Sequence, residues 1–129
     1  MSTIFTKIIE GEIPSYKVAE NDHFLAFLDI QPIVRGHVLV IPKEPIDYIF
    51  DIEDQHLGDF MKFAKLVAKK MDKVFDSKRI GMTVIGLEVP HAHIHLIPIN
   101  GIADMDFNKP KLVISSDEME SIAKMIKEA

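Results

Sequence analysis

Residues 90–98 read PHAHIHLIP, so that three histidines alternate with small or apolar residues. Alternation with a period of two is typical of a β-strand with two different faces, and we predict a strand over His91–Ile97. The histidines would share one face, while Ala92, Ile94 and Leu96 would point to the other face, into a core. Half of the chain's six histidines thus gather on one expected surface, which makes this segment a candidate functional site.

Four other segments are short, apolar and bounded by turn-forming residues, as strands are. They are Tyr16–Ala19, Phe24–Asp29, His37–Ile41 and Ile80–Ile85. Glu20, Asn21 and Asp22 favour a turn between the first two, and Pro42 ends the third because proline cannot donate to a ladder. The sequence therefore predicts five strands, of which the histidine segment is the last.

Helical periodicity is strongest in the segment that opens at Asp51. Apolar residues recur there at helical steps and predict a core-facing stripe on a helix of about twenty residues. They are Leu57, Phe60, Met61, Ala64, Val67, Ala68, Met71 and Val74. A short N-terminal helix is expected to end at Ile9, and a capping pattern, Ser115 with Glu118 three residues later, predicts a final helix to Lys127.

This order of elements predicts a single α+β domain over residues 1–129, with a mostly antiparallel five-stranded sheet, one long helix and short terminal helices. A chain of 129 residues can bury a sizeable core. The absence of cysteine excludes disulfides, thiol catalysis and thiolate metal sites. Without a signal-peptide pattern or an apolar stretch near the roughly 18 residues of a membrane span, we expect a cytoplasmic protein with no membrane partner.

The net charge of −5 and the pI near 5.6 argue against a nucleic-acid polymer as partner. The densest basic cluster recurs at helical spacing, which is typical of a solvated helix face; it consists of Lys62, Lys65, Lys69, Lys70 and Lys73. A small anionic ligand can still bind to a chain with a negative net charge if local dipoles hold it.

The spacing of the three histidines separates two kinds of chemistry. Successive residues on one strand face lie about 6–7 Å apart, so the outer pair would be about 13 Å apart. Metal–nitrogen bonds of about 2 Å cannot bridge that gap, and a metal would need a further residue such as His37. In covalent catalysis, the central imidazole attacks an electrophile such as phosphorus, while its neighbours orient it and hold charge. The spacing favours the second chemistry.

Three blocks of the sequence resemble the histidine triad (HIT) family. Residues 91–97 match its His-x-His-x-His motif followed by apolar residues. The segment 3–14, TIFTKIIEGEIP, is similar to the N-terminal segment of the nucleotide-binding, Hint-like branch. FLDIQP at 27–32 and GHVLVIPK at 36–43 resemble the middle block. These blocks follow one another in the expected order from residue 3 to residue 98.

The resemblance implies a homodimer with a sheet that continues across the two subunits, and a reaction at the α-phosphorus of a purine nucleotide or nucleotide conjugate. It implies that His93 is the nucleophile that becomes nucleotidylated. By the same resemblance, His91 and His95 orient its ring and contact phosphate oxygens, and His37 completes the site. No metal and no other cofactor is expected.

The nucleotide itself would be held by residues outside the triad. Asp29 matches a carboxylate that accepts hydrogen bonds from the ribose hydroxyls. Six apolar residues match positions that line the base pocket in the family, although each alone could equally be a core residue; they are Phe5, Ile8, Ile13, Phe27, Leu28 and Ile30.

The loop before the triad departs from the family pattern. Gly86 stands at the family glycine and is expected near the nucleotide, but Leu87 replaces a glutamine, and an asparagine and a glycine-rich loop are missing. A leucine side chain cannot donate to a phosphoryl oxygen, so stabilisation of the transition state would be weaker. Glu88 is either a turn residue or, when protonated, a general acid for an amine leaving group at the nucleotide site.

We therefore expect a nucleoside phosphoramidase that acts through a covalent nucleotidyl-His93 intermediate. Two alternatives within the same fold are a dinucleoside polyphosphate hydrolase and a nucleotide-binding regulatory dimer with little turnover. The lost phosphate donors count against the polyphosphate substrate, which carries more anionic groups. A metal-dependent hydrolase or cupin-like protein is a further alternative, which the histidine spacing disfavours.

Overall fold

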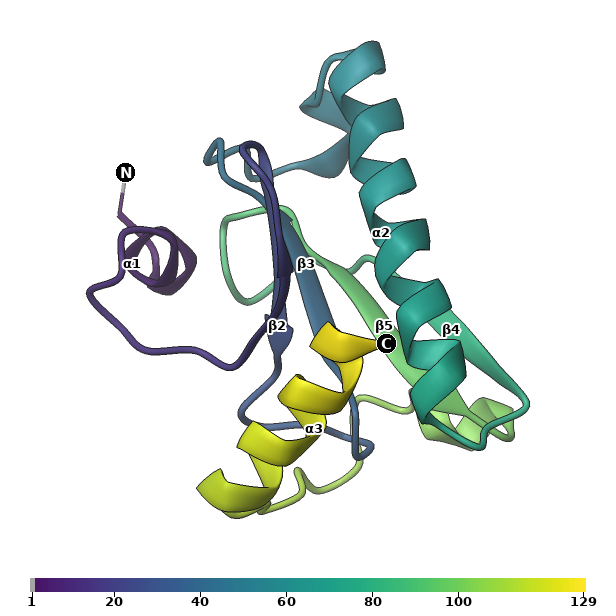
Figure 1. The fold of residues 1–129 in the computed structure, drawn as a ribbon. Coiled ribbons are helices and arrows are strands. Elements are labelled where there is room, and N and C mark those ends of the chain that lie inside the picture. Colours follow the sequence, from purple (N-terminus) through teal and green to yellow (C-terminus); the bar gives the residue numbers. More distant parts are fainter. Residues whose placement is uncertain (1) are drawn as a thin grey trace.

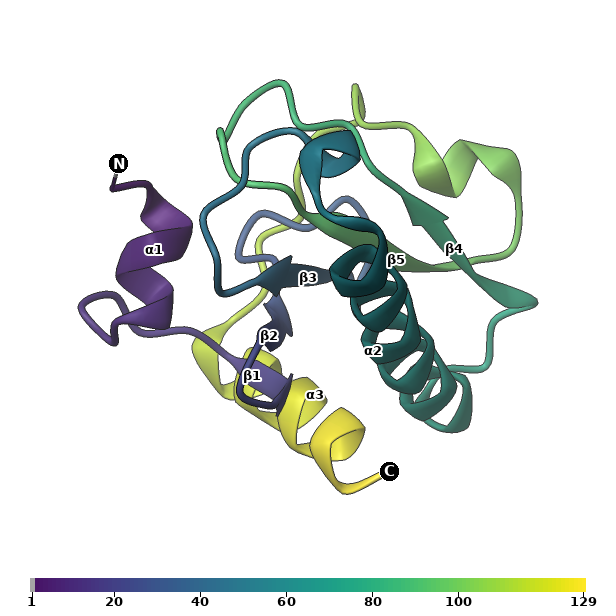
Figure 2. The same cartoon turned by 90° about the horizontal axis from the view of Figure 1, so that it is seen from above.

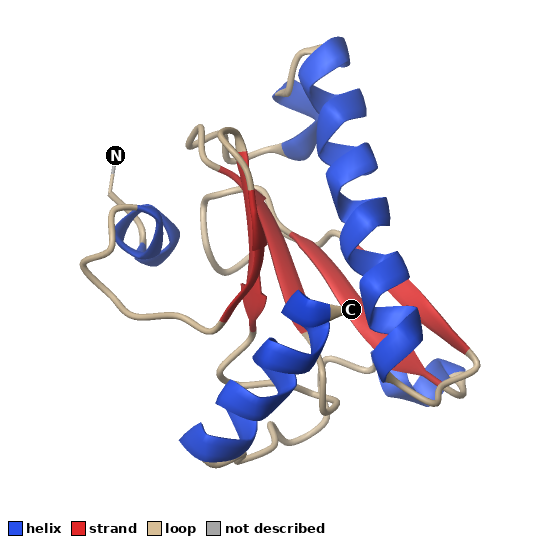
Figure 3. Ribbon diagram, viewed as in Figure 1, coloured by secondary structure: helices blue, strands red, loops and turns tan. Residues whose placement is uncertain are grey.

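Five strands form one antiparallel sheet in the computed structural model, which describes residues 2–129 (Figures 1 and 3). The strands are β1 Lys17–Glu20, β2 Phe24–Leu28, β3 Val38–Pro42, β4 Arg79–Thr83 and β5 Ile94–Ile99, and their order in the sheet is β1-β2-β3-β5-β4. The helices are α1 Ile4–Ile9, α2 Asp54–Val74 and α3 Ser116–Glu128, with the 3₁₀ helices η1 Ile49–Asp51 and η2 Ile102–Met105. The predicted α+β class and antiparallel sheet are confirmed.

Helices cover both faces of the sheet (Figures 1 and 2). Helices α2 and α3 pack on one face, where Phe24, Ala26 and Leu28 of β2 point into the larger core. Helix α1 lies on the opposite face, and there Leu25 and Phe27 join a second, smaller core. Because side chains alternate along a strand, β2 is buried on both faces and is apolar throughout.

Helix α2 has the predicted length but begins at Asp54 rather than at Asp51, which belongs to η1. The side chain of Glu53 caps the helix by accepting from the Gln55 N–H. Its buried stripe includes Phe63, whereas Met61, expected in the stripe, is exposed. The position of the Glu53 cap thus sets the start of the helix, three residues after Asp51.

Helix α3 begins at the expected cap, Ser115, and the cap of helix α1 is Thr3. Thr3 and Thr6 form a reciprocal capping box at the start of α1. In α3, the Ser115 hydroxyl accepts from the Glu118 N–H, but the Glu118 carboxylate pairs with Arg35 Nε at 2.9 Å. The predicted box is therefore only half formed, because the carboxylate has a charged partner near β3.

The histidine strand begins later than predicted, at Ile94 rather than at His91. The Ala92 N–H donates to the Ile46 carbonyl at 2.7 Å, so it is not available to a neighbouring strand. The alternation of faces persists, because Ala92, Ile94 and Leu96 all lie in the larger core. Of the three alternating histidines, His95 thus lies on the strand, while His91 and His93 lie in the segment just before it.

Strand β4 is also shorter at its C-terminal end than predicted, and it ends at Thr83 rather than at Ile85. Within residues 2–129, no helix combines the length and the apolar character that a membrane crossing requires.

Candidate active site

Four histidine rings lie next to one another beside the second core. The ring centroids of His93 and His95 are 4.9 Å apart, and those of His95 and His37 are 5.1 Å apart. The Phe5 ring of α1 packs edge-on against His91 and His93, at 5.8 Å and 5.1 Å. All four histidines are buried, so the row is a covered interior site and not the open surface that the alternation alone suggested.

Main-chain carbonyls determine which nitrogen of His93 and of His91 carries the proton. The Nδ1 atom of His93 lies 2.7 Å from the carbonyl oxygen of His91. Because a carbonyl only accepts, Nδ1 must be the donor, and Nε2 of the neutral ring keeps its lone pair. In the same way, Nε2 of His91 donates to the Pro42 carbonyl at 2.7 Å. The buried Nδ1 atom of His91 has no hydrogen-bond partner among the described residues.

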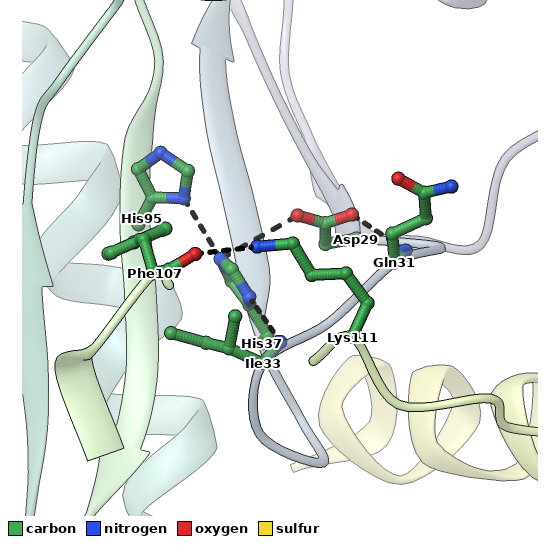
Figure 4. Close-up of polar contacts among 7 residues, drawn as sticks. All are labelled: Asp29, Gln31, Ile33, His37, His95, Phe107 and Lys111. Atoms are coloured by element: carbon green, nitrogen blue, oxygen red, sulfur yellow. Dashed lines mark hydrogen bonds and ion pairs between the residues drawn. The ribbon is translucent and has the colours of Figure 1, made fainter. Parts of the chain in front are cut away.

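A second chain of hydrogen bonds runs through His37 to His95 (Figure 4). The Ile33 N–H donates to Nδ1 of His37 at 3.4 Å, which leaves the proton of this ring on Nε2. Nε2 of His37 then donates to Nδ1 of His95 at 2.9 Å. The remaining proton of neutral His95 is therefore on Nε2, where it can donate to a ligand.

Burial favours the neutral form of His37, His91 and His95. Desolvation is the largest cause that lowers the pKa of His37 to about 4 and that of His95 to about 3, and the charge of Lys111 contributes to both. The pKa of His91 is lowered too, first by burial, although its bond to the Pro42 carbonyl acts in the opposite direction. Neutral imidazoles at pH 7 provide lone pairs and single donors rather than positive charge.

Asp29 lies at the end of the row, just after β2. Its Oδ1 atom accepts from the Gln31 N–H at 2.8 Å, and its Oδ2 atom lies 3.8 Å from Nε2 of His37. The side chain is partly exposed, so the second oxygen can accept hydrogen bonds from a ligand.

A metal ion could in principle bind to Asp29, His37 and His95, because one ligand atom of each residue lies within 4.8 Å of the others. Such an ion would need lone pairs on both Nε2 of His37 and Nδ1 of His95. The Ile33 N–H that points at Nδ1 of His37 favours the tautomer with a proton on Nε2 instead. The local hydrogen bonds therefore favour proton donation from His37 to His95 over coordination of a metal ion by these two rings.

The expected base-pocket residues divide between the two faces of the sheet. Phe5, Ile8 and Phe27 pack together in the second core beside the histidines, and Ile13 packs against them. Leu28 lies in the larger core on the opposite face, because it follows Phe27 on a strand. The expectation that Leu28 lines the base pocket is corrected by this placement. Ile30 follows Asp29 in the chain and belongs to neither core, since its side chain is 66% exposed.

The loop before the triad is open to solvent. Gly86 has a φ of 77°, a conformation that favours glycine, and Leu87 is 88% exposed. Glu88 is exposed as well, while Val89 packs against the second core. The structure thus provides no buried carboxyl group at Glu88.

Two further residues at the site had no signal in the sequence. The Phe107 ring, from the segment after η2, packs edge-on against His95 with centroids 4.8 Å apart. Lys111 follows four residues later, and its positive charge helps to lower the pKa of both His37 and His95. Both residues come from an irregular segment, whose path over the sheet cannot be read from periodicity.

The family model described as the HIT domain matches residues 10–101 of the chain. The chain belongs to the HIT family. A HIT relative from Saccharomyces cerevisiae, adenosine 5'-monophosphoramidase HNT1, is 45% identical over 96 residues, which cover 74% of this chain and 61% of that protein. The adenosine 5'-monophosphoramidase hnt1 of Schizosaccharomyces pombe is 34% identical over 128 residues, 98% of this chain and 96% of that protein.

Solved HIT structures have the same fold. A Hit-like protein from Bartonella henselae superposes with a TM-score of 0.85 at 32% identity, over 98% of this chain and 95% of that chain. The histidine triad nucleotide-binding protein of Candida albicans gives a TM-score of 0.68 at 34% identity, over 98% and 96% of the two chains. The expected family membership is therefore confirmed.

Proposed function

We propose that this HIT protein hydrolyses nucleoside phosphoramidates or similar nucleotide conjugates at the α-phosphorus, through a covalent nucleotidyl-His93 intermediate. The observation that carries the proposal is the bond from Nδ1 of His93 to the His91 carbonyl at 2.7 Å. It holds the ring in one orientation and leaves Nε2 as a lone-pair nitrogen, which is what a nucleophile requires.

In the first step, Nε2 of His93 forms a bond to phosphorus, and the bond from phosphorus to the amine nitrogen breaks. The amine leaves with a proton that it takes from solvent. In the second step, water attacks the phosphorus, the bond to Nε2 breaks, and the nucleotide is released with loss of the water proton. The Nε2 proton of His95 is suited to donate to a phosphoryl oxygen, whose charge grows in both transition states.

The neighbouring residues would hold the nucleotide. We infer that Asp29 accepts from the ribose hydroxyls, and that Phe5, Ile8, Ile13 and Phe27 contact a purine base. Their common position in the second core beside the triad supports this inference. Ile30 would cover the ribose side of the pocket, and Gly86 and Glu88 would flank the leaving group.

The named relatives also favour this substrate class, since two of them are adenosine 5'-monophosphoramidases. One observation favours the alternative of a nucleotide-binding dimer with little turnover, namely the exposed side chain of Leu87, which cannot donate to a phosphoryl oxygen. A dinucleoside polyphosphate is the weaker alternative, because its additional phosphates would find no cationic or amide side chain in the loop of residues 84–90.

We further propose that the protein forms a homodimer through the β4 edge of the sheet. This edge is followed by the exposed apolar residues Val84, Ile85 and Leu87. The β1 edge instead carries the ion pair of Lys17 and Glu20 at 3.3 Å. Charged side chains protect an edge from pairing, so β4 is the edge that suits a partner strand.

The decisive experiment compares wild-type protein with the His93→Ala variant on adenosine 5'-phosphoramidate and on a diadenosine polyphosphate. Wild type should give a burst of adenylated protein and then steady turnover of the phosphoramidate. His93→Ala should lose both, a loss of at least about 10³-fold in kcat for removal of a nucleophile.

The matched control is His23→Ala, because His23 is exposed and lies outside the row. It should leave turnover unchanged. Turnover that survives His93→Ala would contradict the covalent mechanism, and turnover that a chelator abolishes would point to a metal. Nucleotide binding without any turnover in wild type would favour the regulatory dimer.

A further inference from the structure

The proposed reaction centre has little positive charge of its own. The pKa values of His37, His91 and His95 are all lowered, chiefly by burial, so these rings are neutral near pH 7. The carboxylate of Asp29 lies beside them, 3.8 Å from His37. The exposed side chain of Leu87, in the loop before the triad, has no donor to offer. An anionic substrate therefore needs a cation from another part of the chain.

Lys111 approaches the same site from the segment between η2 and α3. Its Nζ atom donates to the Phe107 carbonyl at 3.3 Å and lies 5.7 Å from the centre of the Phe107 ring. Figure 4 shows the side chain extending toward His37 and Asp29. The electrostatic effect of its charge on both His37 and His95 agrees with this placement.

The position of Lys111 is built into the fold. The neighbouring Leu112 N–H donates to the Pro32 carbonyl at 2.8 Å, which ties the segment to the loop that leads to His37. Phe107 packs edge-on against His95, so it anchors the other end of the segment. The ammonium group has three donors and uses one of them for the Phe107 carbonyl, so two stay free for a ligand.

We propose that Lys111 is a substrate-binding residue whose ammonium group pairs with the phosphoryl oxygens of the nucleotide conjugate. It would supply the positive charge that the loop before the triad, residues 84–90, does not provide. The inference rests on the proposed function, because it assumes a phosphoryl anion beside His95. It adds a residue to the site and accounts for an anionic ligand on a chain with a net charge of −5.

The test is isothermal titration calorimetry with 5′-AMP and with adenosine, which lacks the phosphoryl group. Lys111→Gln should weaken AMP binding by about tenfold, as expected for one charge-assisted hydrogen bond, and should leave adenosine binding unchanged. Lys111→Arg should retain most of the AMP affinity. The AMP affinity of the Gln variant should also fall less steeply with added salt.

Lys109→Gln is the matched control, because it removes the same charge two residues away, where Lys109 acts on Asp104. It should bind AMP as wild type does. The proposal is overturned if Lys111→Gln binds AMP like wild type, or if AMP and adenosine weaken equally, which would indicate a packing effect. It is also overturned if wild type binds AMP no more tightly than adenosine.

Phosphoramidate turnover by wild type, measured in parallel, separates this inference from the proposed function. An inactive wild type would contradict the proposed hydrolase, while a preference for AMP that disappears in Lys111→Gln would still support the anion site. An active wild type with an unaltered Lys111→Gln variant would overturn the Lys111 inference alone.

Discussion

The hydrogen-bond partners of each imidazole ring determine which of its nitrogens carries the proton. The carbonyl of His91 holds the proton of His93 on Nδ1, and the Ile33 N–H leaves that of His37 on Nε2. Identical imidazole rings thus present different groups to a ligand: Nε2 of His93 offers a lone pair, whereas Nε2 of His95 offers a proton. Neither assignment depends on the side chains of the motif alone.

The lowered pKa values predict that stability falls in acid. Unfolded histidines bind protons below their ordinary value of 6.5, whereas folded His37 and His95 bind them only below about 4 and about 3. Between these limits the unfolded state holds more protons, so the free energy of unfolding decreases as the pH falls. The slope should approach roughly 1.4 kcal/mol per pH unit for each of the two histidines.

Urea unfolding between pH 7.5 and pH 4 measures this slope. His95→Asn removes one titrating ring and keeps an acceptor for His37, so its slope should be clearly smaller. His23→Asn is the control on the exposed surface and should keep the slope of wild type. A wild-type stability that is flat over this range would contradict burial of neutral histidines.

At the scale of the elements, the turn between β2 and β3 delivers His37 to the site. Gly36 precedes this histidine with a φ of 91°, and its Cα lies against the Phe75 ring at the C-cap of α2. A side chain at this position would overlap the ring. The close approach places the end of the long helix against the turn that precedes His37.

Gly36→Ala should therefore lower the free energy of unfolding by about 2–4 kcal/mol, from the positive φ together with the steric overlap. Thermal and urea denaturation measure the loss. Gly58→Ala in α2 is the matched control, since open space surrounds that glycine, and it should stabilise by about 0.5–1 kcal/mol. If both variants were equally stable, the packing of Phe75 on Gly36 would be contradicted.

At the scale of the whole molecule, the sheet separates two cores of different size. The larger core joins the sheet to α2 and α3, and the smaller core joins it to α1 beside the histidines. The sheet ends at β4, whose outer edge no other strand of the described chain covers. This edge is the place where a second subunit would extend the sheet.

Sedimentation equilibrium should accordingly find a dimer for wild type and a monomer for Met82→Lys. Met82 lies on β4 and is half exposed, so an ammonium group there would be buried without a partner in the dimer. Met125→Lys on α3 replaces a comparably exposed methionine away from β4 and should stay dimeric. A monomeric wild type at micromolar concentration would contradict the proposed assembly.

Much of the fold could be predicted because its signals are local. The stripe of α2, the caps at Thr3 and Ser115, and the alternation around Ile94 each arise from neighbours in sequence. The errors lie at boundaries, where distant groups compete for main-chain hydrogen bonds. The Ile46 carbonyl takes the Ala92 N–H, so the ladder of β5 cannot begin at His91.

The sequence by itself determined the α+β class and the row of histidines opposite Ala92, Ile94 and Leu96, because periodicity assigns side chains to faces. Its resemblance to known motifs, and not its periodicity, indicated the family. Tertiary structure alone decided that the row is buried, since Phe5 and Phe107 cover it from elements far apart in the chain. It also decided the proton positions and the approach of Lys111. These depend on contacts between distant segments, which no local pattern in a sequence encodes.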